Sequence, residues 1–325
     1  MGTLVKTHIQ LGRNRRTIYP TPVSVLPPHA RSREVCVNSM QGMGDNIFQR
    51  PYIHTLCGLF ETVYLDSPWP HLYWDMPDNL HLFRSGTRLR TQRKNEESIK
   101  EFYGEGPPSI TRVFRPGYIL NKSGSVYKDF DGRIPRSGFF FHMEPPNEWG
   151  EDLPFDPTEP FCVVRNTTVR REWHVPNRNC RNEYLQFAAS KYKNLTGHQM
   201  IEIADIDGDV ETLDGEHIHA ADVRLTKGEL KHPGLIWAFR HAAAVISCTG
   251  FALPLAQMVK ANALIIFGGY DLPEWFTHPD QDCPDVITIT PDKPCGCHKK
   301  NHNCPLDISQ ARLNKSIRRL VNHVI

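Results

Sequence analysis

The 325-residue sequence lacks the features that would place it in several special classes of protein. No stretch approaches the ~18 consecutive apolar residues of a membrane span, and the start of the chain lacks the apolar core of a secretory signal. Internal repeats and low-complexity tracts are missing too, which excludes a repeat architecture. The formal net charge is only +2. Such a balance neither requires nor excludes an anionic partner.

What remains is the composition of an ordinary globular protein, with 39% hydrophobic and 23% charged residues. The length is about twice that of a usual domain, so we expect two domains, each with its own core. Cysteine occurs nine times, an odd number, and no export signal accompanies it. This favours a reduced, cytoplasmic location over a disulfide framework.

Strands and helices alternate in two blocks, on either side of a segment rich in glycine, proline and aromatic residues at 104–160. In the first block the pattern predicts strand 34–38, helix 46–58, strand 62–66 and a strand near 80–84. In the second block it predicts strand 161–165, helix 177–193, strand 198–205, helix 232–244, strand 244–248, helix 250–261 and strand 262–269. Buried strands that alternate with helices predict an α/β fold, with parallel sheets covered on both faces.

Two such blocks suggest two Rossmann-like domains that face a central cleft. The expected boundaries are a basic N-terminal arm at 1–33, a first domain at 34–150, a second at 151–305 and a C-terminal helix at 306–325. The terminal helix is amphipathic and can pack back on the first domain. Ligands of open α/β sheets bind beyond the carboxyl ends of the strands, so residues at those ends are candidates for a functional site.

Asp45 stands at such an end, in the stretch MQGMGDNIF between a predicted strand and a predicted helix. Asp is among the preferred N-cap residues, so capping the helix is the simplest role. The alternative role is direct participation of the Asp45 carboxylate in a reaction. A helix N-terminus should lower the pKa of Asp45 below its reference value of about 3.9. Gly44, next to it, would let a bound molecule approach the backbone closely.

The stretch SCTGF (247–251) joins a buried strand to a helix. A glycine turn before a helix N-terminus leaves backbone N–H groups open to an anion, and a threonine hydroxyl adds a donor. A plain strand-to-helix turn explains the stretch equally well. The residues that would form the anion site are Cys248, Thr249, Gly250 and Phe251.

The stretch RNTTVRR places hydroxyls and positive charge at another strand end. Guanidinium groups pair well with phosphates, so this density suggests a diphosphate site formed by Arg165, Thr167, Thr168, Arg170 and Arg171. Arginines that only decorate the surface are the alternative. The next predicted strand ends in acidic residues. Asp205 or Asp207 could bind ribose hydroxyls, or both could simply be turn residues.

Aromatic and basic side chains gather in the first block. The loop SPWPHLYWDMP contains Trp69, His71 and Trp74, and the segment 84–94 contains Arg88, Arg90 and Arg93. Aromatic rings stack on sugars or bases, and arginines pair with phosphates, so both segments are candidates for binding a substrate. A solvated basic surface is the more common explanation of such a charge run.

Near the end of the chain, the stretch DKPCGCHKKNHNCP is dense in cysteine and histidine. Such density permits a zinc site formed by Cys295, Cys297, Cys304 and His302, with His298 close by. The Cys-x-Cys spacing departs from the usual Cys-x-x-Cys knuckle. Free or redox-active thiols are therefore the favoured interpretation, zinc the second and a disulfide the third.

Taken in order, these stretches resemble glycosyltransferase family 9, the ADP-heptose:lipopolysaccharide heptosyltransferases, which have the GT-B fold. The resemblance covers 34–310 and rests on the Gly-Asp pair, the Thr-Thr pair with basic residues after it, and the Thr-Gly turn before an alanine-rich helix. Two positions depart from the family. The Asp of its Asp-Thr-Gly turn is Cys248 here, and the His expected three residues after the glycine is Leu253. These departures suggest a different sugar, acceptor or both.

The resemblance implies that Asp45 is the general base of a sugar transfer. It implies that the Thr-Thr pair and the Thr-Gly turn hold a nucleotide-diphosphate sugar on the second domain, with Arg170 or Arg171 near the place of the family's phosphate-binding lysine. On the first domain it implies an acceptor site, for which we name Gly44, Asn46, Trp69, His71, Trp74, Arg88, Arg90 and Arg93. Arginines, hydroxyls and a helix N-terminus can stabilise a departing diphosphate, so we expect an inverting, metal-independent reaction without a further cofactor.

Two acceptors fit this picture: a phosphorylated glycan such as lipopolysaccharide core, or DNA with a hydroxymethylated base, as phages modify their genomes. The DNA base would need flipping out of the duplex, and the location would then be the host cytoplasm. A same-fold nucleotide-sugar epimerase and a non-catalytic nucleic-acid-binding protein are the alternatives. We expect a monomer or homodimer.

Overall fold

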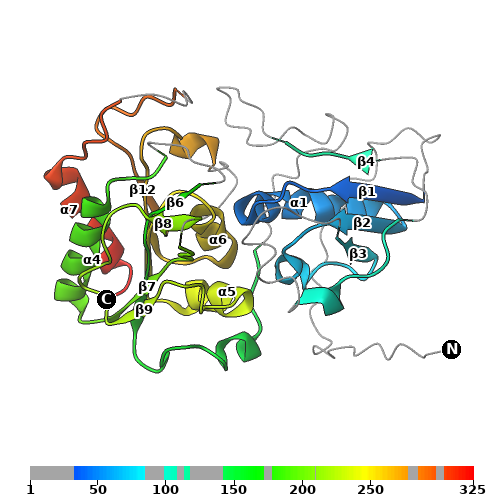
Figure 1. The fold of residues 1–325 in the computed structure, drawn as a ribbon, viewed down its shortest axis with the longest axis horizontal. Helices are drawn as coiled ribbons and strands as arrows, with labels where there is room; N and C mark the ends of the chain where they lie inside the picture. Colours follow the sequence, from blue (N-terminus) through cyan, green and yellow to red (C-terminus); the bar gives the residue numbers. More distant parts are fainter. Residues whose placement is uncertain are drawn as a thin grey trace.

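A computed structural model describes residues 33–84, 99–107, 113–117, 142–171, 178–208, 210–276, 285–297 and 304–325. Within these residues the chain forms two parallel sheets, one from each half of the sequence, with helices between and around them (Figure 1). This confirms the predicted α/β fold with parallel sheets. None of the helices in the described ranges combines the length and apolar character that a membrane crossing requires.

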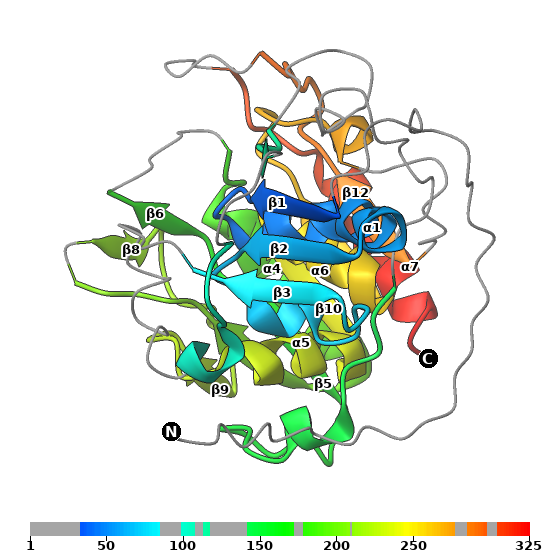
Figure 2. The ribbon, with the colours of Figure 1, turned by 90° about the vertical axis from the view of Figure 1, so that its right-hand side faces the viewer.

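The first sheet has four parallel strands in the order β3-β2-β1-β4. They are β1 (Glu34–Asn38), β2 (Thr62–Asp66), β3 (Leu80–Phe83) and β4 (Val113–Phe114). The helix α1 (Met43–Leu59) links β1 to β2 and buries Ile47, Ile53 and Leu56. Figure 2 looks at this sheet from the side of the first half, with β1, β2 and β3 in front. The site residue Asp45 lies in the first turn of α1, just beyond the carboxyl end of β1.

The second sheet has six parallel strands in the order β12-β11-β10-β5-β7-β9. They are β5 (Phe161–Arg165), β7 (Gln199–Ile203), β9 (Val223–Leu225), β10 (Ala244–Cys248), β11 (Ala263–Ile266) and β12 (Val286–Ile289). Counted along the chain, this is the strand order of dinucleotide-binding sheets, in which the order reverses between the first and fourth strands. Those strands are β5 and β10 here. Their carboxyl ends therefore mark the place where a ligand is expected.

Helices cover both faces of the second sheet. One face carries α4 (Asn182–Thr196) and α7 (Gln310–Asn322), and the other carries α5 (His232–His241) and α6 (Ala252–Val259). The expectation that the terminal helix packs on the first domain is wrong. Its apolar stripe, with Leu313, Ile317 and Leu320, packs instead against α4, β11 and β12, on the side of the second half that is remote from the first (Figure 1).

The two halves meet through α1 and α6. One continuous buried cluster runs from β1 and α1 of the first half to α5, α6 and β11 of the second. A Cβ on Gly44 would lie 3.3 Å from both the Phe251 Cα and the Pro254 Cγ. Glycine at position 44 therefore allows the close approach of these two segments, which is a packing reason rather than the predicted approach of a bound molecule.

Candidate active site

Asp45 is the third residue of α1, and it does not cap that helix. The N-cap is Gly42, whose φ of −73° and ψ of 147° are extended and whose carbonyl accepts the first helical bond, from the Asn46 N–H at 3.0 Å. The Asp45 carboxylate reaches back and accepts a hydrogen bond from the Gly42 backbone N–H. This is the acidic half of a capping box, which replaces the predicted N-cap role.

Burial raises the pKa of Asp45 to about 6. The positive charge of Arg178 and the Gly42 N–H both act to lower the pKa, but they are weaker than the desolvation. The sequence-based expectation of a lowered pKa is therefore wrong in sign. A helix N-terminus does favour the anion, yet removing a carboxylate from water outweighs that effect here. Asp45 is thus a stronger base than an ordinary aspartate.

Asn46, predicted to contact an acceptor, has a structural role. Its side chain is fully buried, and its amide nitrogen donates to the carbonyls of Met40 and Gly42 at 2.6 and 2.8 Å. Its amide oxygen accepts from the Ser67 and Tyr73 hydroxyls at 2.7 and 3.0 Å. Asn46 therefore fastens the loop before α1 to the loop after β2, and this holds Gly42 and Asp45 in place.

Arg178 was not predicted, although it is the charged group that most lowers the pKa of Asp45. It comes from the second half, just before α4. Its Nε donates to Asp271 Oδ2 at 3.3 Å, and its backbone carbonyl accepts a hydrogen bond from the Thr249 hydroxyl at 3.2 Å. Arg178 and Asp45 are far apart in the sequence, so no local pattern could have paired them.

The carboxyl ends of β5 and β10 bring together Arg165, Cys248, Thr249, Gly250 and Phe251, as predicted. Arg165 Nη1 donates to the Cys248 Sγ at 3.1 Å and to the Thr249 carbonyl at 3.4 Å. Its guanidinium also lies 4.8 Å from the centroid of the Phe251 ring. Gly250 has a φ of 115°, which a residue with a side chain rarely adopts.

The positive charge of Arg165 is the distinctive feature of this edge of the sheet. It is half-buried, and among the described residues no carboxylate pairs with it. The position where the resemblance expects an Asp holds the Cys248 thiol, which accepts a hydrogen bond without neutralising the guanidinium. An arginine held in this way can bind a phosphate.

The other residues predicted to bind a diphosphate lie mostly in or next to a two-stranded antiparallel sheet formed by β6 (Thr168–Arg170) and β8 (Glu211–Leu213). The Thr167 hydroxyl donates to the Asp214 carbonyl at 3.0 Å, and the Thr168 hydroxyl to Glu211 Oε1 at 2.7 Å. Arg170 pairs with Glu211 at 3.1 Å, whereas Arg171 is exposed. These contacts hold the two-stranded sheet together, so Thr167, Thr168 and Arg170 serve its structure.

The Thr249 hydroxyl, Asp205 and Asp207 also have partners within the protein. Thr249 was predicted to offer its hydroxyl to an anion, but it donates to the Arg178 carbonyl. Asp205 forms a β-bridge with Lys227, and Asp207 forms one with Glu211. Both acids therefore lie in the connection between β7 and β8, where the alternative interpretation as turn residues fits their position.

The predicted acceptor-binding aromatic residues pack between the halves. The ring centroid of Trp69 lies 4.5 Å from that of His232 on α5, and the ring centroid of Trp74 lies 5.9 Å from that of Trp149. The His71 ring packs edge-on against the rings of Trp149 and His232, with centroid separations of 5.6 and 6.1 Å. These five rings form the interface cluster, so the three predicted residues stabilise the contact between the halves. Arg88, Arg90 and Arg93 lie outside the described residues.

Burial in this cluster lowers the pKa of both histidines. The pKa of His71 falls to about 4 and that of His232 to about 3, in each case mainly through loss of hydration. For His232 the neighbouring His71 adds to the effect. Both imidazoles are therefore neutral at physiological pH.

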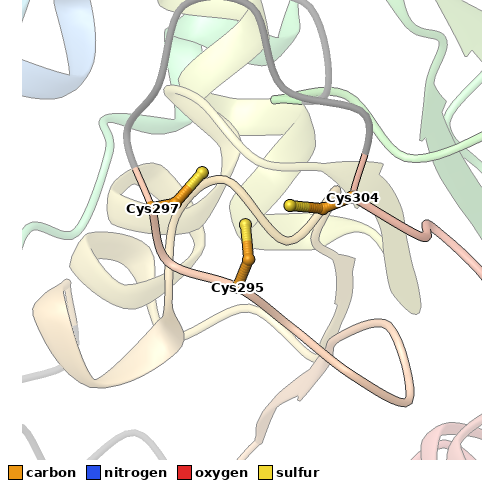
Figure 3. Close-up of side chains that lie close together, drawn as sticks. All are labelled: Cys295, Cys297 and Cys304. Carbon is orange, nitrogen blue, oxygen red and sulfur yellow. The ribbon is translucent and has the colours of Figure 1, made fainter.

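The cysteine-rich stretch does bring three thiols together (Figure 3). The sulfur atoms of Cys295, Cys297 and Cys304 all lie within 4.8 Å of one another. Cys295 also donates from its Sγ to the Gly269 carbonyl at 3.3 Å. His298 and His302, the other candidate ligands, lie outside the described residues.

Neither the family models nor the curated protein sequences give a match to this chain. Solved structures do. A glycosyltransferase family 9 protein from Veillonella parvula matches with a TM-score of 0.55 and 12% identity, over 89% of this chain and 97% of that one. TibC, an iron-containing dodecameric glycosyltransferase from enterotoxigenic E. coli, matches with a TM-score of 0.56 and 13% identity, over 90% and 77%.

The E. coli ADP-heptose lipopolysaccharide heptosyltransferase II matches with a TM-score of 0.55 and 11% identity, over 89% of this chain and 98% of that one. At such low identities the likeness concerns the fold. The chain therefore has the α/β fold of these family 9 and heptosyltransferase structures.

Proposed function

We propose that this protein is a glycosyltransferase of the GT-B type, which moves a sugar from a nucleotide-diphosphate donor to an acceptor hydroxyl. One observation carries the proposal. A basic carboxylate, Asp45, stands one residue from the Gly44–Phe251 contact, and the Phe251 ring lies under the guanidinium of Arg165. A proton acceptor and an anion-binding group thus meet where the two sheets' carboxyl edges approach each other.

The chemistry follows from these two groups. The acceptor oxygen attacks the anomeric carbon, and the bond from that carbon to the diphosphate oxygen breaks. The hydroxyl proton passes to a carboxylate oxygen of Asp45, and the electron pair of the broken bond leaves on the diphosphate. Arg165 stabilises the negative charge on the diphosphate, together with the backbone N–H groups at the start of α6. This attack from the face opposite the leaving group inverts the anomeric centre.

The donor proposal has independent support from the structures of similar fold. TibC has been solved in complex with ADP-D-β-D-heptose, and that structure matches this chain with a TM-score of 0.50 and 12% identity. A nucleotide-diphosphate sugar is therefore the donor class we propose. Because Cys248 and Leu253 replace the Asp and His that the family resemblance expects, the sugar itself need not be a heptose.

For the acceptor we favour a phosphorylated glycan over DNA. The aromatic rings that favoured a base-stacking site, Trp69, His71 and Trp74, are engaged in the interface cluster. What still supports DNA is the charge of the arm at 1–33 and of segment 84–94. Incubation of the protein with a panel of nucleotide sugars plus lipopolysaccharide core or hydroxymethylated DNA, read by mass spectrometry, decides between them. The added mass identifies the sugar, and the labelled molecule identifies the acceptor.

The decisive variant is Asp45→Asn. It should lower kcat about 10²–10⁴-fold, since a general base contributes on that order, and it should leave donor affinity unchanged. The wild-type kcat/KM should rise with pH around an apparent pKa of about 6, as Asp45 loses its proton. Asp78→Asn, at an exposed aspartate of the same half, is the matched control and should behave as wild type.

Persistent transfer by Asp45→Asn would refute the role of Asp45 as base. Turnover of the donor without any acceptor would point to an epimerase instead. Failure to bind any nucleotide sugar, combined with salt-sensitive DNA binding, would favour the non-catalytic alternative.

A further inference from the structure

The thiols of Cys295, Cys297 and Cys304 form a second potential site, separate from Asp45 and Arg165. All three are half-buried, and their sulfur atoms lie within 4.8 Å of one another. They come from two directions, since Cys295 and Cys297 flank Gly296 whereas Cys304 precedes the segment that leads to α7 (Figure 3). The spacing in the sequence does not by itself bring Cys304 close to the other two cysteines, so the proximity of the three sulfurs is a feature of the fold.

The geometry distinguishes a metal site from a disulfide. Two sulfurs bound to one zinc ion at roughly 2.3 Å in a tetrahedral arrangement are about 3.8 Å apart. The three sulfurs lie within 4.8 Å of one another, so side-chain shifts of about 1 Å are enough to reach that separation. A disulfide joins only two sulfurs, at about 2 Å, and would leave the third unexplained. Thiolate ligands select soft or borderline ions such as Zn²⁺ and iron over Mg²⁺ or Ca²⁺.

The backbone is shaped to present these thiols. Gly296, between the first two cysteines, has a φ of 52°, so the chain turns sharply there. Its N–H donates to the Gly269 carbonyl at 3.0 Å, and a Cβ on Gly296 would lie 2.8 Å from Leu272 Cδ1. The Cys-Gly-Cys turn is therefore fixed against the loop that follows β11, and its two side chains are oriented before any ion binds.

We propose that Cys295, Cys297 and Cys304 are three thiolate ligands of one structural transition-metal ion, of which zinc is the expected identity. Binding replaces the thiol protons, and these are released to solvent. The ion joins the Cys295–Cys297 turn and Cys304 to one another beside the Gly269–Asp271 turn. This inference does not depend on the proposed function, because it concerns metal content rather than sugar transfer.

The position of the ion gives it a consequence for the other site. Asp271, at the end of the Gly269–Asp271 turn, is the ion-pair partner of Arg178, whose charge acts on Asp45. A metal beside this turn therefore stabilises the second half near Arg178 without touching substrate. The role of the ion is therefore structural rather than catalytic.

Metal analysis of the wild-type protein, expressed in zinc-supplemented medium and purified under reducing conditions, is the first test. Inductively coupled plasma mass spectrometry should find about one metal ion per chain. A mercurial reagent that blocks thiols should release the ion to a coloured chelator. Exchange with Co²⁺ should give the intense sulfur-to-metal absorption of tetrahedral thiolate coordination. None of these readouts requires activity.

Single serine variants of Cys295, Cys297 and Cys304 should each lower the metal content about tenfold or more, and removal of the ion from wild type should lower the thermal midpoint. Cys57→Ser, at a buried cysteine of α1, is the matched control and should keep its metal. A metal-free wild type that shows no cobalt spectrum would overturn the site, as would a protein lighter by two hydrogens because of a disulfide. Iron at the same stoichiometry would uphold the ligands and overturn zinc.

Discussion

At the residue scale, the basicity of Asp45 results from a competition between burial and two favourable electrostatic interactions. Arg178 and the Gly42 N–H favour the anion, yet loss of hydration prevails and raises the pKa to about 6. The outcome suits a general base, because a carboxylate with this pKa is ionised at neutral pH and still accepts a proton readily. The Gly42 N–H also orients the carboxylate, so the position of Asp45 can be tested by a substitution at Gly42.

Gly42→Ala should misplace the Asp45 carboxylate without removing it. A Cβ at position 42 would lie 2.4 Å from Asp45 Oδ2, so the carboxylate must move. The φ of −73° at Gly42 is open to alanine, and the backbone itself is not strained. We expect kcat to fall about 10²-fold, since displacement of a reacting group by ~1 Å has that effect, with folding retained.

The matched control for Gly42→Ala is Gly58→Ala, in the last turns of the same helix. Nothing lies within 4 Å of a Cβ at Gly58, and the residue is exposed. This variant should keep full activity and gain about 0.5–1 kcal/mol of stability, measured by urea unfolding. Equal activity of the two alanine variants would contradict the positioning of Asp45 by Gly42.

Arg165→Gln tests the anion site. The guanidinium donates to Cys248 and Thr249 and lies over the Phe251 ring, and no carboxylate of the described residues pairs with it, so its loss leaves no carboxylate unpaired. Donor affinity should fall about 10- to 100-fold, as expected for a charged hydrogen bond to phosphate. Calorimetric titration with the donor nucleotide measures this affinity. Arg240→Gln, at a half-exposed arginine paired with Glu144, is the control, and similar losses in both variants would refute the assignment.

At the scale of elements, the loop between β1 and α1 depends on Asn46. Both amide hydrogens and the amide oxygen are used, which links this loop to Ser67 and Tyr73 beyond β2. Such a saturated buried amide specifies one arrangement of two loops. We infer that Asn46 is what keeps the N-terminus of α1 from fraying, although Gly42 supplies no side-chain cap.

Asn46→Asp should therefore destabilise the protein by about 3 kcal/mol at neutral pH. The carboxylate has no hydrogens to donate to the Met40 and Gly42 carbonyls, and a negative charge would be buried beside them. Urea unfolding followed by circular dichroism measures the change. Asn147→Asp, at an exposed asparagine, should change stability by less than about 0.5 kcal/mol. A small effect at position 46 would mean that the amide network is not required.

Local patterns in the sequence were sufficient for most elements. The runs EVCVN, TVYLD, FCVVR and AVISC match β1, β2, β5 and β10, because strands buried on both faces are nearly continuous apolar stretches. The short strands β4, β6, β8, β9 and β12 were missed. Each has two to four residues, which is too little for periodicity to detect.

At the scale of the whole molecule, the candidate site could be predicted only in part. Asp45 and the SCTGF turn were found because the carboxyl ends of parallel strands are local features of the sequence. The partners Arg178 and Asp271 were missed, since their contacts depend on how the halves pack. The same packing explains why Trp69 and His71 were assigned to a substrate: a sequence cannot tell an aromatic residue in an interface from one in a binding site.

The interface cluster should make the stability of the protein fall as the solution becomes acidic. In the folded protein the pKa of His71 is about 4, against about 6.5 in an unfolded chain, so the unfolded state takes up a proton first as the pH falls. Stability from His71 is therefore present above pH 6.5 and is lost between pH 6.5 and 4. Asp45 acts in the opposite direction, because its folded pKa is raised.

His71→Phe isolates this contribution, since phenylalanine fills the same space among Trp149, Phe102 and His232 but does not titrate. Between pH 7 and 4.5 the wild type should lose about 2 kcal/mol more unfolding free energy than the variant, a value reduced from the full pKa shift because His71 is half-buried. Urea unfolding at several pH values, followed by tryptophan fluorescence, measures the difference. His219→Phe, at an exposed histidine, should follow the wild-type pH dependence. If instead the gap between wild type and His71→Phe stays constant across this range, His71 is not held neutral by the contact between the halves.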